Sequence, residues 1–160
     1  MSLGGEWRMK LASDLNAVAK VPVNPVENPF VPTVLYNAMI RPLVPYAVRG
    51  AIWYQGENNA PRAYRYRDLL PQMIASWRND WNRQFPFLIV QLANYMQRKD
   101  QPAESEWAEL REAQLLTSEA VAGSGLAVAV DVGLADDIHP TDKQTVGERL
   151  SLVARRSFCC

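Results

Sequence analysis

Three short apolar segments alternate with helical patterns along this chain, and this alternation is the feature that most constrains the fold. The apolar segments are residues 51–54, 87–93 and 126–132. Each is shorter than an ordinary helix and lacks the apolar-polar alternation of a half-exposed strand, which is typical of a buried β-strand. Apolar strands that are separated by helices predict an α/β fold with a parallel sheet covered on both faces.

A helical pattern follows each predicted strand, with apolar residues recurring at steps of three or four. This spacing predicts three amphipathic helices. Pro140 suits the first turn of the third helix, where its missing N–H is no loss. A further short helix is predicted within residues 33–45, bent or ended by Pro42. The apolar positions are Leu35, Met39 and Leu43; Tyr66, Leu70, Ile74 and Trp77; Trp107, Leu110, Ala113 and Leu116; Val146, Leu150 and Val153.

Composition fits a single domain whose partners are small or neutral. The chain has 160 residues, of which 48% are hydrophobic, enough for an ordinary core. Its 17 basic and 17 acidic residues cancel and form no block of like charge, which disfavours nucleic acid and anionic membrane surfaces as partners. The apolar segments are too short to span a bilayer, and the start lacks the layout of a signal peptide.

Both ends of the chain differ from the predicted domain at residues 32–154. Three prolines within residues 1–31 (Pro22, Pro25 and Pro29) predict an extended linker, and residues 1–5 are typical of a cloning remnant. Residues 155–160 have no periodic pattern and are predicted to be a disordered tail. Cys159 and Cys160 are adjacent, which provides neither a disulfide framework nor a metal-binding spacing.

The only histidine, His139, follows the third predicted strand in a loop with two aspartates. An imidazole that titrates near neutrality acts as a general base when a carboxylate orients it. Asp136 has a suitable spacing of three residues, and Asp137 can also reach the ring through a tight turn. The alternative is a surface histidine whose acidic neighbours favour the start of a helix.

The loop after the first predicted strand is dense in amide and carboxylate groups. Gly56 can offer its backbone N–H to an oxyanion, and Asn59 can add a side-chain N–H. Three further residues, Gln55, Glu57 and Asn58, would position the loop or bind a polyhydroxylated substrate. The alternative is a polar turn in which Gly56 supplies an unusual dihedral angle and Asn59 caps the next helix. Because the carboxyl ends of parallel strands share one rim, we expect this loop near that of His139.

Five segments, in order along the chain, resemble the sialate O-acetylesterase family of the SGNH (GDSL-like) hydrolase superfamily. They are residues 32–40, 50–60 (GAIWYQGENNA), 85–94, 107–114 (WAELREAQ) and 137–144 (DIHPTDKQ). The resemblance implies a three-layer flavodoxin-like fold and hydrolysis of acetyl esters on sugars by a serine, without a metal or cofactor. By position, His139 matches the catalytic histidine, and Gly56 and Asn59 match the oxyanion block. The orienting carboxylate stays open between Asp136 and Asp137.

The nucleophile block of this superfamily is missing from the chain. The family serine follows the first strand in a Gly-Asp-Ser or Gly-x-Ser turn, whereas Ser124 precedes the strand predicted from Leu126. We therefore expect this chain to be the C-terminal part of a catalytic domain, inactive by itself and prone to self-association through an unpaired sheet edge. The full protein is expected to be secreted or periplasmic. Two other functions stay open: an acetylxylan-type esterase, and a non-catalytic carbohydrate-binding fragment.

Overall fold

The computed structural model describes residues 32–158 and divides the chain into two units, residues 1–43 and 44–160. The described part of the first unit is a short π-helix, Tyr36–Ile40, followed by a 3-10 turn, Arg41–Leu43. The helix predicted here is therefore two irregular pieces, and the second contains Pro42. The predicted linker at 1–31 and the cysteine pair at 159–160 lie outside the described residues.

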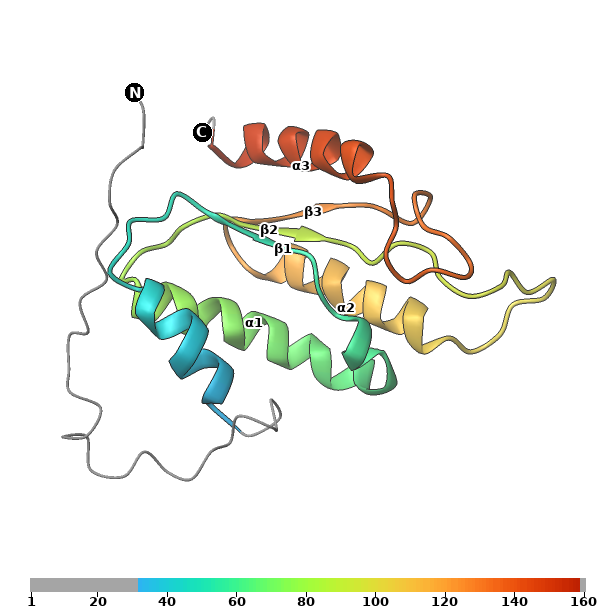
Figure 1. The fold of residues 1–160 in the computed structure, drawn as a ribbon, viewed down its shortest axis with the longest axis horizontal. Helices are drawn as coiled ribbons and strands as arrows, with labels where there is room; N and C mark the ends of the chain where they lie inside the picture. The colour runs from blue at the N-terminus through green and yellow to red at the C-terminus, as the bar shows by residue number, and fades with distance from the viewer. Residues whose placement is uncertain (1–31, 159–160) are drawn as a thin grey trace, which may run out of the picture. The chain divides into compact units, whose positions relative to one another are not determined.

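The second unit is built on a three-stranded parallel sheet (Figure 1). Its strands are β1 (Ala51–Trp53), β2 (Phe87–Val90) and β3 (Ser124–Ala127), in the order β1-β2-β3. The central strand β2 is buried along its whole length, as its apolar sequence predicts. The parallel α/β fold class is thus confirmed.

Three helices cover the two faces of this sheet (Figure 1). The helices α1 (Ala63–Asp80) and α2 (Glu106–Ala120) lie on one face, and α3 (Lys143–Phe158) lies on the other. Side chains alternate along β2 accordingly, since each strand sends successive residues to opposite faces. One core contains Phe87, Ile89, Leu70, Ile74 and Leu110, and the other contains Val90, Ala129 and Val146.

The third strand differs from its prediction at both ends. It begins at Ser124, before the predicted Leu126, and it ends at Ala127 instead of residue 132. The Ala127 carbonyl still accepts a backbone hydrogen bond, from the Gln91 N–H. The next carbonyl, that of Val128, instead accepts a bond from the Arg149 side chain of α3, at 2.8 Å. Beyond Ala127 the chain therefore leaves the sheet and becomes a loop.

The last helix also differs from its prediction. It begins at Lys143, so Pro140 lies before the helix and not in its first turn. The Asp142 side chain sets this start, because its carboxylate accepts the Thr145 N–H at 3.0 Å as an N-cap does. The helix then continues to Phe158, so residues 155–158 are helical where a disordered tail was predicted.

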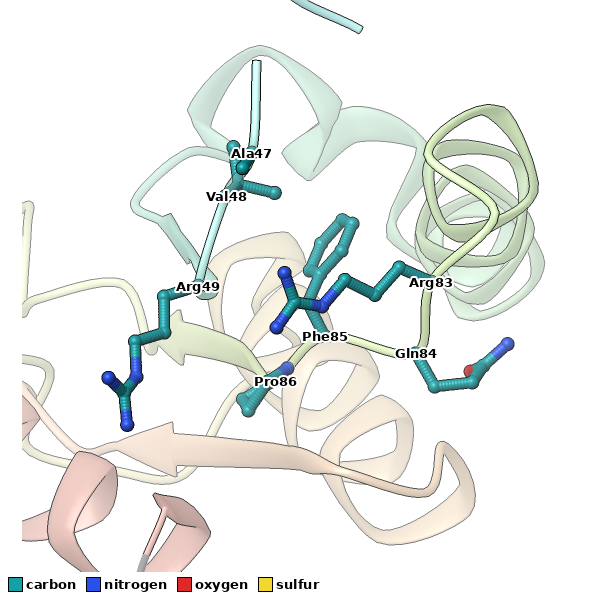
Figure 2. A pocket seen from close by; sticks show the side chains of 7 residues that line it. All are labelled: Ala47, Val48, Arg49, Arg83, Gln84, Phe85 and Pro86. Carbon is teal, nitrogen blue, oxygen red and sulfur yellow. The ribbon is translucent and has the colours of Figure 1, made fainter. Parts of the chain in front are cut away.

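The amino ends of the strands are held by a buried arginine. Arg78 of α1 is only 6% exposed, and its guanidinium donates to the carbonyls of Phe85, Ala122 and Gly123. Burial lowers the pKa of this guanidinium. A hollow of about 380 Å³ opens at this end of the sheet, between the segments that precede β1 and β2 (Figure 2). It is lined by Ala47, Val48, Arg49, Arg83, Gln84, Phe85 and Pro86. This hollow lies at the end of the sheet opposite the predicted site.

Candidate functional site

The two loops that carry the predicted site residues leave the sheet at the same end (Figure 1). One follows β1 and the other follows β3, at the carboxyl ends of these parallel strands. Tyr54, directly after β1, connects the two regions: it packs in the core cluster of Val146, and the Lys143 Nζ lies 5.1 Å from its ring centroid. The loop after β1 and the start of α3 therefore meet at this tyrosine.

Gly56 sits in a position that only glycine fits well. It is buried, its φ of +151° is one that other residues rarely adopt, and a Cβ atom would lie 2.7 Å from Leu110 Cδ2. A 3-10 helix, Glu57–Arg62, starts directly after it. The turn at Gly56 is thus pressed against α2, and the unusual dihedral angle that the sequence suggested is present.

Gln55 is held from the core side by Tyr66 of α1. The Tyr66 hydroxyl lies 3.3 Å from the Gln55 carbonyl and 3.1 Å from its side-chain Oε1, and it accepts the Trp53 Nε1–H at 3.0 Å. Burial raises the Tyr66 pKa to about 12, and the nearby charge of Glu57 acts in the same direction. The hydroxyl is therefore a neutral donor at ordinary pH, and the Gln55 side chain contributes to holding its own loop.

The backbone N–H of Gly56 donates a hydrogen bond to a negatively charged oxygen. Its partner is the carboxylate of Glu57, at 2.8 Å. Asn58 is exposed, and Asn59 is half-buried within the 3-10 helix and is not its cap. The Asn59 side chain has no hydrogen-bond partner among residues 32–158, which leaves its amide group available.

His139 lies beside Asp137. The Asp137 Oδ1 accepts the His139 backbone N–H at 2.8 Å and lies 3.5 Å from the ring Nδ1. Asp136 is exposed and makes no hydrogen bond or ion pair with any residue between 32 and 158. Of the two candidate carboxylates, the structure thus places Asp137 at the imidazole. The His139 side chain is 87% exposed, so its ring is open to solvent on the other sides.

The loop that carries His139 is attached to its neighbours by polar contacts and by two apolar side chains, Val132 and Ile138, which pack against the core. The Asn94 side chain, after β2, accepts the Gly133 N–H at 2.7 Å, and a Cβ on Gly133 would lie 2.0 Å from the Asn94 carbonyl oxygen. Arg149 of α3 pairs with Asp131, with 2.7 Å between Nη2 and Oδ2. This bond lowers the pKa of the Asp131 carboxyl to about 2.

A second hollow adjoins the His139 loop. Its volume is about 360 Å³, and it lies in the segment between β2 and α2. Met96, on its wall, donates its backbone N–H to the Ala135 carbonyl at 3.0 Å, which joins this segment to the His139 loop. The lining combines an aromatic ring with polar groups and includes Tyr95, Gln97, Lys99 and Glu104.

No hydrogen bond or ion pair among residues 32–158 joins the two predicted halves of the site. Within residues 32–158, His139 makes no hydrogen bond or ion pair with the loop after β1. Six serines lie in this range, and none sits in a glycine turn directly after a strand: two are Ser105, which caps α2, and Ser124, whose hydroxyl donates to the Val121 carbonyl before β3. The described residues also contain no cluster of metal ligands, and none of their helices is long and apolar enough to cross a membrane.

A parallel α/β sheet with a histidine beside an aspartate and a buried glycine turn at its carboxyl rim places the chain in the class of α/β proteins whose ligands bind at this rim. A family model described as carbohydrate esterase, sialic acid-specific acetylesterase, matches residues 24–154. The chain belongs to this family of carbohydrate esterases.

Curated relatives and a solved structure agree with this assignment. The chain is 37% identical to the sialate O-acetylesterase of Rattus norvegicus and 34% identical to that of Homo sapiens, over 84% of its length. A carbohydrate acetylesterase from Xanthomonas citri is 48% identical, covers 79% of this chain and superimposes with a TM-score of 0.74. The chain spans 28% of the rat protein, 29% of the human protein and 30% of the bacterial one.

Sequence reasoning did not single out the residues that hold the two loops in place. In the structure these loops are held by Gln114, Tyr66, Asn94 and Gly133. For Gln114 a signal was present, since it is a polar residue on the buried stripe of an amphipathic helix, where an uncharged polar group needs partners. For Asn94 and Gly133 no local pattern pointed to their contact, which joins residues 39 positions apart.

Proposed function

We propose that this chain provides the histidine and the oxyanion turn of a carbohydrate O-acetylesterase, with 9-O-acetylated sialic acid as the preferred substrate. The observation that carries the proposal is the Gly56 N–H, which already binds a carboxylate oxygen at 2.8 Å. Such an N–H is the donor that a tetrahedral intermediate of ester hydrolysis requires. Family membership supports the reaction class, and the relatives described as sialate O-acetylesterases support the substrate.

Each residue has a distinct role in this proposal. His139 takes the proton of a serine nucleophile through Nε2 and later donates it to the leaving sugar hydroxyl, while Asp137 orients the ring at Nδ1. The Gly56 N–H and the Asn59 side chain stabilise the oxyanion, after the Glu57 carboxylate has left the Gly56 N–H. Asp136 makes no hydrogen bond or ion pair with residues 32–158, whereas Asp137 lies beside the ring, so we propose Asp137 as the orienting group.

The hollow beside the His139 loop is a suitable place for the sugar. An aromatic ring such as Tyr95 packs against the apolar face of a pyranose, and Gln97 and Glu104 offer groups for its hydroxyls. The lining carries one cation, Lys99, and two carboxylates, Glu104 and Glu106, so the choice of sialate over a neutral xylan chain rests on the relatives described as sialate O-acetylesterases. The acetylxylan-type activity is therefore our second candidate.

The serine must come from sequence beyond residues 32–158, because none of the serines described there stands in a nucleophile turn. The test compares the chain alone with the chain joined to an upstream segment that contains a Gly-x-Ser turn after an apolar strand. Both are assayed on p-nitrophenyl acetate, on 9-O-acetyl sialic acid and on acetylated xylo-oligosaccharide. His139→Ala and Asp137→Asn are made in the longer protein, with Asp136→Asn as the matched control.

We expect no turnover by the chain alone, and turnover by the longer protein that is lost in His139→Ala and reduced in Asp137→Asn but not in Asp136→Asn. Higher kcat/KM on the sialate ester supports the named substrate, and the reverse order assigns the acetylxylan-type activity. Activity of the longer protein that survives His139→Ala contradicts the proposed mechanism. Saturable sugar binding without any hydrolysis by the longer protein makes the chain part of a binding module instead.

A further inference from the structure

A buried side-chain carboxamide lies where the pairing of β1 and β2 ends, at the carboxyl rim of the sheet. Gln114 of α2 is fully buried, and its side chain lies between the ends of β1 and β2. The last paired residues of these strands are Trp53 and Ile89, so the ladder between them stops just before this point. A side-chain amide has the same donor and acceptor groups as a peptide, and it can therefore continue a ladder that the backbone no longer makes.

The hydrogen bonds of Gln114 match this description. Its Oε1 accepts the Leu92 N–H at 2.9 Å, and its Nε2 donates to the Gln55 carbonyl at 3.1 Å and to the Val90 carbonyl at 3.4 Å. One side chain thus joins the segment after β1 to the segment after β2. Buried polar groups that lose such partners are costly, so these contacts fix both segments relative to α2.

The contact with the Gln55 carbonyl has a consequence for the next N–H. The Gln55 carbonyl and the Gly56 N–H belong to one planar trans peptide, in which the C=O and N–H bonds point in opposite directions. Gln114 and Tyr66 both hold the carbonyl on the core side. The Gly56 N–H is consequently directed away from the core, where it meets the Glu57 carboxylate.

We infer that Gln114 is a positioning residue for the oxyanion turn, because its carboxamide orients the peptide between Gln55 and Gly56. Its catalytic meaning rests on the function proposed above, whereas the orientation of the peptide does not. Gln114 itself is fully buried beneath the turn and acts through Gly56. Leu110, one turn earlier on α2, supports the same peptide by filling the space next to the Gly56 Cα.

A matched control is Gln91, which lies directly after β2 and bonds to the same helix, α2. Gln91 is also a buried glutamine, and its Nε2 donates to the Arg111 carbonyl of α2 at 3.1 Å, with no contact to the turn. Gln114→Met and Gln91→Met remove the same chemical group and keep a side chain of similar length. A difference between the two variants therefore reports on the turn, and not on the loss of a buried amide in general.

The first measurement is the backbone amide signal of Gly56 in nitrogen-15 NMR spectra of this chain, which needs no enzyme activity. We expect Gln114→Met to shift and broaden this signal and to speed its hydrogen exchange about tenfold or more, the order expected when one buried hydrogen bond of about 1.4 kcal/mol is lost. We expect Gln91→Met to leave the signal in place. Tyr66→Phe removes the second donor to the Gln55 carbonyl, together with the hydroxyl contacts to Gln55 Oε1 and Trp53 Nε1, and should move the signal in the same direction by less.

The second measurement is kcat and KM in the longer, active protein. We expect Gln114→Met to lower kcat by about tenfold or more at unchanged KM, less than the roughly hundredfold loss typical of removing an oxyanion donor. If both methionine variants stay folded and the Gly56 signal is the same in both, the inference is wrong. If Gln114→Met fails to fold, Gln114→Glu takes its place, because it keeps an acceptor for the Leu92 N–H and replaces the Nε2 donor to the Gln55 carbonyl; an unmoved Gly56 signal in that variant overturns the inference. A protein without esterase activity contradicts the proposed function but leaves the NMR result to decide this inference.

Discussion

The turn at Gly56 and the loop of His139 lie on the same rim, yet they are built in opposite ways. The turn is buried, and it is fixed by the core side chains Leu110, Gln114 and Tyr66. The His139 ring is 87% exposed, and its loop is held by a side-chain amide and an ion pair. One half of the candidate site is therefore enclosed by the hydrophobic core, whereas the other half exposes its histidine on a loop that Ile138 anchors to the core.

This difference indicates which half of the candidate site the fold of this chain positions by itself. The buried turn is set by its contacts with Leu110, Tyr66 and Gln114, all of which lie within residues 44–158. An exposed histidine with one carboxylate beside it has its ring oriented on one side only. The proposed serine nucleophile would supply the contact on the other side, which is consistent with a site that needs sequence beyond these residues.

The largest effect is expected from a substitution that disrupts the buried turn. Gly56→Ala introduces a Cβ atom at 2.7 Å from Leu110 Cδ2 and a strained dihedral angle, so we expect the free energy of unfolding to fall by about 3 kcal/mol. Urea unfolding followed by circular dichroism measures this change. Gly147→Ala in α3 is the control, because no atom lies within 4 Å of its added Cβ and alanine favours helix, so it should stabilise by about 0.5 to 1 kcal/mol. Equal stability of the two variants would show that the turn is not constrained by packing.

The next effect appears when the buried phenol is titrated. The Tyr66 pKa is raised from 10.0 to about 12, so the folded state favours the neutral phenol. Stability should be complete below pH 10 and should fall as the pH rises towards 12, by about 2 kcal/mol from roughly 1.4 kcal/mol per pKa unit. Urea unfolding at several alkaline pH values tests this, with Tyr66→Phe as the variant that lacks the effect. The expectation fails if wild type and Tyr66→Phe lose stability in parallel over this range.

A smaller effect should follow from displacing the exposed loop. In Gly133→Ala the added Cβ would lie 2.0 Å from the Asn94 carbonyl oxygen, so the loop must move and the Gly133 N–H loses the Asn94 side chain. Because this loop is largely exposed, we expect a loss of only about 1 kcal/mol in global stability. Hydrogen exchange should increase in residues 128–142 and stay unchanged in α1. A loss as large as that of Gly56→Ala would mean that both halves of the rim belong to one cooperative core.

The smallest effect is expected from acid. Arg149 lowers the Asp131 pKa from 3.8 to about 2, so this pair favours the folded state above pH 4 and loses its contribution as the pH falls towards 2. The pair is exposed, and salt should weaken it further. Hydrogen exchange of residues 128–142 at pH 5 and pH 3 is the measurement, with Asp131→Asn as the control that has lost the pair at both values. If hydrogen exchange of residues 128–142 is the same in wild type and Asp131→Asn at pH 5, the ion pair does not help to hold this loop.

The sequence by itself determined the order of elements, the parallel sheet and the two loops that leave it at one rim. These follow from the spacing of apolar residues, which records the burial of each face, and from the rule that parallel strands end on the same side. The boundaries of β3 and α3 were less certain from sequence. The end of β3 coincides with the bond that Arg149 donates to the Val128 carbonyl, and the start of α3 coincides with the bond that the Thr145 N–H donates to the Asp142 carboxylate.

Only the tertiary structure shows which aspartate lies beside the His139 ring: both spacings were possible, and the Asp137 Oδ1 lies 3.5 Å from Nδ1. It also decided that Gln114 reaches the peptide before Gly56, across 59 positions of sequence. Periodicity reports which residues are buried, but it does not report which groups meet when helix and sheet pack. A hydrogen bond forms only when donor and acceptor lie within a few tenths of an ångström of the right distance, and such distances are fixed only once the chain has folded.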